Sequence, residues 1–115
     1  MRVVHYSKYF IWFEAGRVEL LRSVGIQFKD FEKKGLFFPV VEAMASYKAP
    51  ARFDDEILLK TKITKIGNTS IRFENQVIKL PEHSLICEGH TVHVLTDSDG
   101  RPTQIPEDLR AGLST

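Results

Sequence analysis

His5 and Tyr6 are the residues whose types and position are best suited to chemistry. They lie in residues 3–17, a run that begins as a short β-rich segment and turns at once into a helix. A helix that begins directly after a strand presents free backbone N–H groups and the positive end of its dipole. Such donors stabilise a developing oxyanion when titratable side chains lie beside them. The run therefore predicts a site that polarises a carbonyl group, although His5 could also be a hydrogen-bonded histidine at the end of a strand.

Glu14 is the next candidate, because it is one of few carboxylates on an otherwise apolar helix. A buried glutamate needs a partner, and Arg17 follows it by about one helical turn. A structural ion pair is the favoured interpretation. A general base is the alternative, although two helical turns separate Glu14 from Tyr6.

The remaining histidines and the single cysteine give no sign of a metal site or a nucleophile. His90 and His93 are three residues apart on an expected strand, so they point to opposite faces and cannot chelate one metal. His83 falls in an expected loop and is predicted to be solvated. Cys87 is predicted to be a buried structural residue. Because it has no second cysteine to pair with, it indicates a reducing cytoplasm.

The composition is that of one ordinary globular domain over residues 1–115. Hydrophobic residues make up 43 %, charged residues 27 %, and the formal net charge is +1. No block of one charge sign indicates a nucleic-acid partner, and no apolar run approaches the ~20 residues of a membrane span. Eight Phe, three Tyr and one Trp predict a tightly filled core, an apolar ligand cavity or a partner surface.

One long helix is predicted to position the candidate residues. Apolar residues recur at helical spacing over residues 7–24, with Ser7 as N-cap and Gly25 directly after the C-terminus. Residues 9–13 are apolar on every side, which predicts a helix buried all round. A further helical turn is expected at residues 27–34, ended by Gly35.

Four strands and a short helix are predicted after Gly35, where the apolar period changes from helical to alternating. The expected strands are residues 37–47, 57–66, 70–79 and 85–96, with a tight turn at 67–68, a hairpin turn at 97–100 and a helix at 105–113. Short connections require antiparallel neighbours. The predicted fold class is therefore α+β, with a curved antiparallel sheet wrapped around one long central helix.

The opening run resembles the hot-dog fold thioesterases of the 4-hydroxybenzoyl-CoA thioesterase/YbgC-like family. The family motif, Asp-x-x-Gly-Val-Val-Tyr/His-His-x-x-Tyr-x-x-x-x-Glu-x-x-Arg, is matched by residues 2–9 and then by Glu14 and Arg17. Further matches are residues 46–55, the turn at 65–70, Glu88-Gly89 and residues 100–102. The resemblance covers essentially the whole chain, and its motifs are specific in combination rather than singly.

The resemblance implies an acyl-CoA thioesterase in which the backbone N–H of Tyr6 polarises the thioester carbonyl and His5 positions water or the thioester. It implies a homodimer or homotetramer, with coenzyme A as part of the substrate and no other cofactor. The residues expected to contact the substrate are Tyr9, Lys48, Arg52, Lys65, Asn68, Thr69 and Ser70. Basic side chains suit the phosphates of coenzyme A, although each of these polar residues could equally be a solvated surface residue.

The chain departs from the family motif at its beginning. Arg2 replaces the motif glycine, and Tyr6 replaces the usual histidine. The family's catalytic Asp and first strand would fall upstream of Met1, so we expect either a shortened chain, which is favoured, or another acid. A non-catalytic hot-dog acyl-CoA-binding or scaffold domain is the competing interpretation. A hot-dog dehydratase is a third, which no Asp/His spacing favours. The acyl group is left open.

Overall fold

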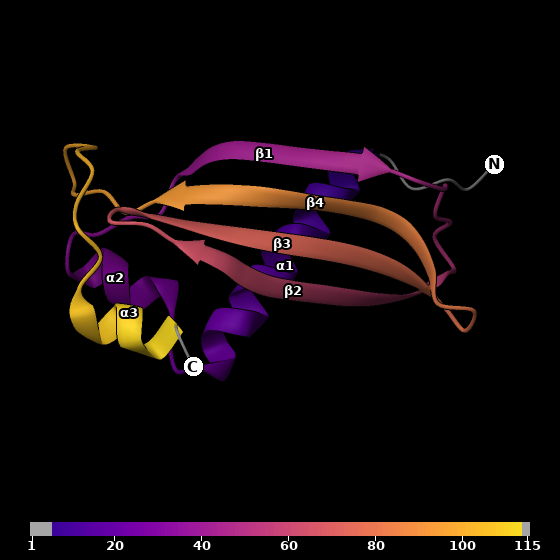
Figure 1. Cartoon of the computed structure of the whole chain (residues 1–115), viewed down its shortest axis with the longest axis horizontal. Coiled ribbons are helices and arrows are strands. Elements are labelled where there is room, and N and C mark those ends of the chain that lie inside the picture. Colours follow the sequence, from indigo (N-terminus) through magenta and orange to yellow (C-terminus); the bar gives the residue numbers. More distant parts are fainter. Residues whose placement is uncertain (1–5, 114–115) are drawn as a thin grey trace.

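The computed structural model describes residues 6–113, without the side chains of residues 6, 7 and 28. Within these residues, three helices and four strands form the layers of the fold (Figure 1). Their bounds are α1 Tyr6–Ser23, α2 Phe28–Lys33, β1 Val40–Tyr47, β2 Glu56–Ile66, β3 Ser70–Leu80, β4 Ser84–Val94 and α3 Glu107–Leu113. The α+β class expected from the change of apolar period is confirmed.

The four strands form one antiparallel sheet in the order β1-β4-β3-β2, so β1 and β2 are its edges. The turn between β2 and β3 is tight, as expected, because Gly67 N–H donates to the carbonyl of Ser70 at 2.8 Å and Ile66 pairs with Ile71. The short connections therefore give antiparallel neighbours at β2–β3 and β3–β4. β1 and β2 are consecutive in the sequence but form opposite edges of the sheet, so residues 48–55 cross from one edge to the other.

Glycine ends both of the first two helices, as the sequence predicts. Gly25 and Gly35 have φ of 83° and 76°, a region that glycine adopts without steric cost. After α1, Gly25 N–H donates to Arg22 O at 3.0 Å and Ile26 N–H to Leu21 O at 2.9 Å. The same pair of bonds follows α2 around Gly35, which makes both ends Schellman motifs.

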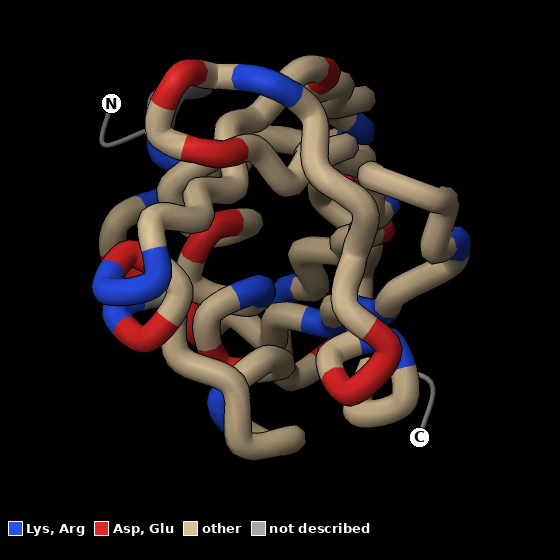
Figure 2. The backbone as a smooth tube through the Cα atoms, turned by 90° about the vertical axis from the view of Figure 1, so that its left-hand side faces the viewer, with Lys and Arg blue, Asp and Glu red and all other residues tan. Residues whose placement is uncertain are grey.

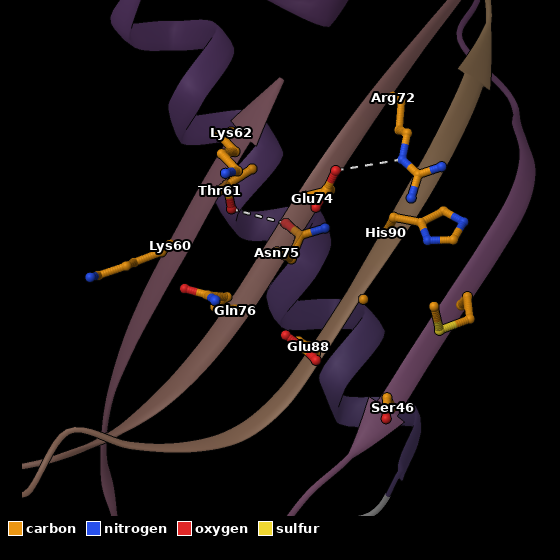
Figure 3. Close-up of a pocket in the computed structure, with 12 residues that line it drawn as sticks. Ser46, Lys60, Thr61, Lys62, Arg72, Glu74, Asn75, Gln76, Glu88 and His90 are labelled. Atoms are coloured by element: carbon orange, nitrogen blue, oxygen red, sulfur yellow. Dashed lines mark hydrogen bonds and ion pairs between the residues drawn. The ribbon is translucent and has the colours of Figure 1, made fainter. Parts of the chain in front are cut away.

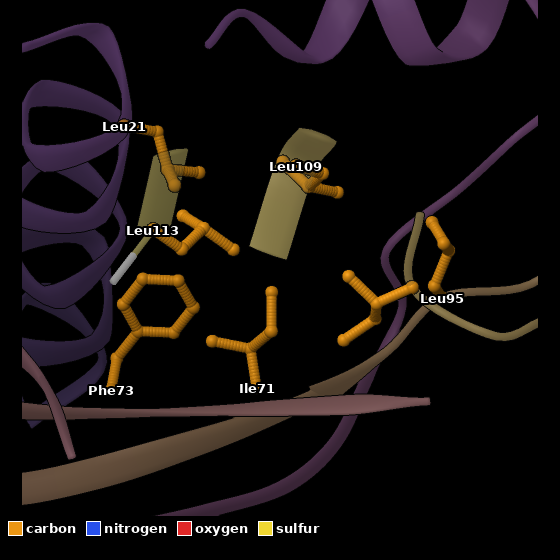
Figure 4. Close-up of a cluster of buried hydrophobic side chains, with 7 residues drawn as sticks. Leu21, Ile71, Phe73, Leu95, Leu109 and Leu113 are labelled. Atoms are coloured by element: carbon orange, nitrogen blue, oxygen red, sulfur yellow. The ribbon is translucent and has the colours of Figure 1, made fainter. Parts of the chain in front are cut away.

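Two apolar clusters fill the space between the sheet and the helices. The first lies under the N-terminal half of α1 and comprises Tyr9, Phe13, Ala51, Val77, Ile86 and Cys87. The second lies where α2 and α3 cover the sheet and comprises Leu21, Ile71, Phe73, Leu95, Ile105, Leu109 and Leu113 (Figure 4). The clusters anchor the two ends of α1 to one face of the sheet.

The expectation that α1 is buried all round is wrong. Tyr9 and Phe13 are only 2 % exposed, but Phe10 is 37 % and Ile11 53 % exposed. The sheet covers one face of α1, and no other described element packs on its opposite face. Residues 9–13 are apolar on every side, yet within residues 6–113 only the face of α1 that packs on the sheet is buried.

α1 crosses the sheet at an unusually close approach. A Cβ atom at Gly16 would overlap the hydroxyl of Thr61 on β2, which itself donates to Asn75 Oδ1 on β3 at 3.0 Å. One turn earlier, the ring of Phe13 would lie only 2.9 Å from a Cβ at Gly89 of β4. Glycine at position 16 therefore allows α1 to approach β2, whereas a Cβ at position 89 would meet the Met44 carbonyl of β1 as well as the ring of Phe13.

This crossing leaves the edge strand β1 uncovered. α1 lies over β2 and β3 and touches β4 through Phe13, so the helix-facing side chains of β1 are only partly covered. Ala43 is exposed and Tyr47 is 40 % exposed although both lie on the helix side of the sheet. A groove consequently runs between α1 and β1.

Replacing Gly16 by alanine should destabilise the fold. The added Cβ must displace Thr61, and overpacking of this kind costs about 1–3 kcal/mol of the free energy of unfolding in urea. Gly112→Ala is the matched control, because its Cβ would meet only Ile26 at 3.9 Å in a helix where alanine is favoured. Adding Thr61→Ala to Gly16→Ala should restore part of the loss. Equal stability of Gly16→Ala and the parent protein would contradict the close approach.

Candidate active site

The groove between α1 and β1 has a volume of about 290 Å³. It is lined by Phe10, Glu14 and Arg17 of α1, Val40 and Ala43 of β1, and Thr91 of β4. Spacings of four and three residues place the three α1 side chains on one face of the helix. Tyr6, at the first residue of α1, precedes Phe10 by one further turn on that face. The groove therefore runs along α1 from Phe10, about one helical turn after Tyr6, to Arg17.

The N-terminus of α1 is a suitable place for a negative charge to develop. The first N–H groups of a helix have no partner within it, and the helix dipole adds partial positive charge there. The first turn of this 18-residue helix contains no acidic residue that would offset this charge. The Tyr6 backbone is thus placed as expected for a carbonyl-polarising donor, and its role stays a prediction. His5 lies outside the described residues, so its role stays a prediction as well.

Arg17 is held by a buried histidine on the floor of the groove. Its Nη1 donates to His93 Nε2 at 2.8 Å, and the Thr91 hydroxyl lies 3.1 Å from the same nitrogen. Because arginine can only donate, Nε2 must be the unprotonated nitrogen, and Nδ1–H donates to the carbonyl of Phe38 at 3.2 Å. His93 is thus a neutral imidazole with a fixed tautomer.

Burial, together with the charge of Arg17, keeps His93 neutral. Burial and the neighbouring guanidinium lower the pKa of His93 to about 4, although the hydrogen bond to Phe38 acts in the opposite direction. Burial also lowers the pKa of Arg17, while Glu14 raises it. The floor of the groove therefore carries one positive charge, on Arg17, at neutral pH.

Glu14 is not the buried residue of its pair, contrary to expectation. Its side chain is 65 % exposed, whereas that of Arg17 is 12 % exposed, and Glu14 Oε1 lies 3.9 Å from Arg17 Nη2. The predicted ion pair is present but loose, and the close partner of Arg17 is His93 instead. The Glu14 carboxylate is therefore an accessible acid on the wall of the groove.

The residues predicted to contact the substrate fall into separate places. Tyr9 is buried in the core, where its ring packs edge-on against Trp12 and Tyr47 at 5.2 and 4.9 Å. Lys48 and Arg52 follow the end of β1, and Lys48 pairs with Glu88 at 3.7 Å.

The turn that contains Lys65, Asn68, Thr69 and Ser70 lies at the other end of the sheet. β1 ends at Tyr47 beside Cys87, and Cys87 pairs with Val77. Val77 is seven residues from Ser70, which corresponds to about 23 Å along a strand. One chain therefore does not bring the two groups of predicted contacts together, and both stay predictions.

A larger hollow, of about 480 Å³, lies on the opposite face of the sheet (Figure 3). Some of its charged side chains have partners, since Arg72 lies 3.7 Å from Glu74, and His90 Nε2 lies 2.6 Å from an oxygen of Glu42, which is not among the residues that line the hollow. It is also separated from the start of α1 by the sheet. We therefore place the candidate site in the groove rather than in this hollow.

The structure places the other titratable residues largely as predicted. His90 and His93 lie on opposite faces of the sheet, and His83 is exposed. Cys87 is fully buried, and burial raises the pKa of its thiol to about 11, so it is protonated at neutral pH. Among residues 6–113, no three His, Cys, Asp or Glu side chains gather where a metal could bind.

Basic and acidic residues alternate along the backbone in the view of Figure 2 rather than forming long runs of one sign. No helix in the described part of the chain is long and apolar enough to cross a membrane. Sequence reasoning missed His93 and Thr91 as parts of the site. The signal that was available is their position on the helix-facing side of β4, two residues apart.

Acid should destabilise the protein through His93. Its pKa is about 4 when folded and near 6.5 when exposed, so between these values the unfolded state binds the extra proton. The stabilisation is complete above about pH 6.5 and is lost as the pH falls towards 4, by up to about 3 kcal/mol. Urea unfolding at about pH 7 and about pH 4.5 should show a smaller difference in His93→Gln than in the parent protein. Equal differences would rule out this effect.

Residues 1–113 match the thioesterase-like superfamily. The chain is 28 % identical over 110 residues to the acyl-CoA thioester hydrolase YbgC of Escherichia coli, which spans 95 % of this chain and 81 % of the relative. It is 30 % identical over 109 residues to the chloroplastic acyl-acyl carrier protein thioesterase ATL2 of Arabidopsis thaliana, of which it covers only 58 %.

Solved structures with a similar fold support the family match. A hypothetical protein, TT1821, from Thermus thermophilus superposes with a TM-score of 0.90 at 36 % identity, covering 99 % of this chain and 86 % of the other. The expected hot-dog arrangement of a sheet around a long helix is thereby confirmed. The chain belongs to the thioesterase-like superfamily.

Proposed function

We propose that this chain hydrolyses acyl-CoA thioesters to the free acid and coenzyme A in the groove between α1 and β1. The observation that carries the proposal is the N-terminus of α1. It has no acidic residue in its first turn, and it lies about one helical turn before Phe10, which lines the groove together with Glu14 and Arg17. Relatives with acyl-CoA thioester hydrolase activity in their names, such as YbgC, support the same reaction.

The proposed chemistry is attack of water on the thioester carbonyl. The water oxygen bonds to the carbonyl carbon, a base takes the water proton, and the carbonyl oxygen becomes an oxyanion. The Tyr6 N–H and the dipole of α1 stabilise that oxyanion, a contribution of about 10²–10³ in rate for one such donor. The C–S bond then breaks, and the coenzyme A thiolate leaves and is protonated. Coenzyme A takes part as substrate only.

This mechanism also requires a general base that takes the proton of the attacking water. Glu14 is the accessible carboxylate of the groove, but eight residues of helix place it about 12 Å from Tyr6 along the axis. An acid at that distance cannot touch a carbonyl held by the Tyr6 N–H of the same chain. Glu14 acting with a second copy, or another acid, would supply it. A non-catalytic acyl-CoA-binding domain stays the second candidate for this reason.

A second copy of the chain is part of the proposal. β1 is an edge strand with unpaired N–H and C=O groups on one side, and edges of this kind pair with another strand. Val40, Val41, Met44 and Tyr47 of β1 are all between 40 % and 59 % exposed. Pairing of two β1 strands would cover these apolar side chains and close the groove. We propose a homodimer at least, in the reducing cytoplasm that the lone Cys87 suits.

Thiol release from acyl-CoA separates the two candidate functions. The parent protein should release free coenzyme A from short acyl-CoAs, measured with a thiol reagent. If Glu14 is the base, Glu14→Gln should lower kcat about 10²–10⁴-fold with an altered pH profile. Glu19→Gln is the matched control, because Glu19 is an exposed glutamate of α1 paired with Arg22.

The outcomes of this assay distinguish the enzyme from the binding domain. Binding of acyl-CoA without thiol release by the parent protein would establish the binding domain and reject the enzyme. Release that is unchanged in Glu14→Gln would assign the base to another group.

Val41→Lys should disrupt the dimer. A lysine on the exposed edge of β1 brings two like charges together in the paired form and keeps single strands solvated. Val18→Lys is the control, since Val18 is 41 % exposed on α1. Sedimentation should give a dimer for the parent and for Val18→Lys and a monomer for Val41→Lys. A monomeric parent protein would contradict the proposed pairing.

A further inference from the structure

We propose that Arg17, fixed by His93, forms the floor of an acyl pocket and limits the substrate to short- and medium-chain acyl thioesters. The inference rests on the proposed function, because it assumes that the thioester carbonyl lies at the N-terminus of α1. It adds the class of acyl group and the residue that selects it.

Arg17 separates two spaces in the molecule. On one side is the open groove, whose walls include Phe10, Val40 and Ala43. On the other is a closed gap of about 10 Å³ in the second apolar cluster, lined by Leu21, Phe31 and their neighbours. Arg17 lines both spaces. The gap is at the lower limit for holding one water molecule, so the interior beyond Arg17 is closed.

The position of the guanidinium sets the length of the pocket. Side chains of a helix lean towards its N-terminus, and Arg17 Nη2 lies 3.9 Å from Glu14 Oε1. The floor is therefore level with the Glu14 carboxylate. Glu14 follows Tyr6 by eight residues, or about 12 Å, and its side chain also leans towards the N-terminus, so the floor lies at most about 12 Å below Tyr6. An extended chain advances about 1.2 Å per bond, as a three-bond residue spans 3.3–3.6 Å. The groove thus accommodates an acyl chain of at most about ten carbons.

The floor is built to stay in place. A longer chain would have to move Arg17 away from His93 Nε2, to which it donates at 2.8 Å. The imidazole beneath is itself fixed by Phe38 and packs edge-on against Phe73 with ring centroids 5.5 Å apart. Pressing methylene groups against the guanidinium would also remove water from a charge without replacing its hydrogen bonds. Long acyl chains are therefore rejected, whereas short chains leave the pair undisturbed.

Arg17→Met tests the floor directly. Methionine keeps an unbranched side chain in the helix but removes the charge and the donors, and its flexible thioether can give way to an entering chain. Arg22→Met is the matched control, since Arg22 is a mostly exposed arginine of the same helix. The measurement is kcat/KM for butanoyl-, octanoyl-, dodecanoyl- and hexadecanoyl-CoA, together with the dissociation constant of each.

The expected result is a fall in kcat/KM between octanoyl- and dodecanoyl-CoA for the parent protein and for Arg22→Met. In Arg17→Met, the ratio of dodecanoyl to octanoyl turnover should rise by at least about tenfold, since methylene groups in an apolar pocket discriminate on that scale. An unchanged ratio, or a parent protein that prefers hexadecanoyl-CoA, would overturn the proposal.

A second variant guards against misfolding of Arg17→Met. Ala43→Leu narrows the groove from the exposed strand β1, so it should shift the preference towards butanoyl-CoA. No shift in Ala43→Leu would likewise contradict the acyl pocket. If the parent protein turns over none of the four thioesters, the proposed hydrolysis fails instead. The dissociation constants of the four thioesters then test whether Arg17 limits chain length, because Arg17→Met should change the preference for chain length in binding in the same direction.

Discussion

The crossing of α1 over the sheet at Gly16 is the constraint on which the rest of the structure depends. Without a side chain at Gly16, the helix backbone comes into contact with Thr61 of β2, and Gly89 of β4 receives the ring of Phe13 in the same way. These two contacts fix both the height and the direction of α1. A helix held over β2 and β3 covers β1 only in part, through contacts such as that of Tyr9 with Tyr47. The groove that we assign as the site is thus a consequence of how the helix is seated.

The same constraint explains why a charged residue lies within an apolar layer. Burial of an arginine is costly unless its charge is paired and its donors are used. Arg17 donates to an imidazole acceptor and has Glu14 at 3.9 Å, rather than a close carboxylate. A neutral partner leaves the positive charge available to the groove. The pair therefore combines a packing role with a charge that a substrate would meet.

Much of the fold could be predicted from the sequence, because its signals are local. Alternating apolar residues gave the faces of β2 and β3, and Gly25 and Gly35 ended their helices where left-handed backbone is required. Local patterns do not show how far a neighbouring layer of the fold covers a helix or strand. Ile11 is apolar but exposed, since only the tertiary arrangement decides which face of α1 receives the sheet.

The site was less predictable, because its partners are far apart in the chain. Glu14 and Arg17 are neighbours on a helix, so their pairing could be foreseen. Arg17 and His93 are 76 residues apart, and only the docking of α1 on β4 brings them together. The oxyanion-stabilising role of Tyr6 follows from resemblance and from the helix end. Neither the resemblance nor the helix end identifies the carboxylate that would complete the site.

A crystal structure with octyl-CoA, a thioether analogue that cannot be hydrolysed, tests the central claim most directly. The account predicts the sulfur end near the N-terminus of α1, the alkyl chain along Phe10 and Ala43, and its last carbon against Arg17, with the contact from Arg17 to His93 intact. An alkyl chain bound on the opposite face of the sheet, beside His90, or between α1 and β2 would contradict it.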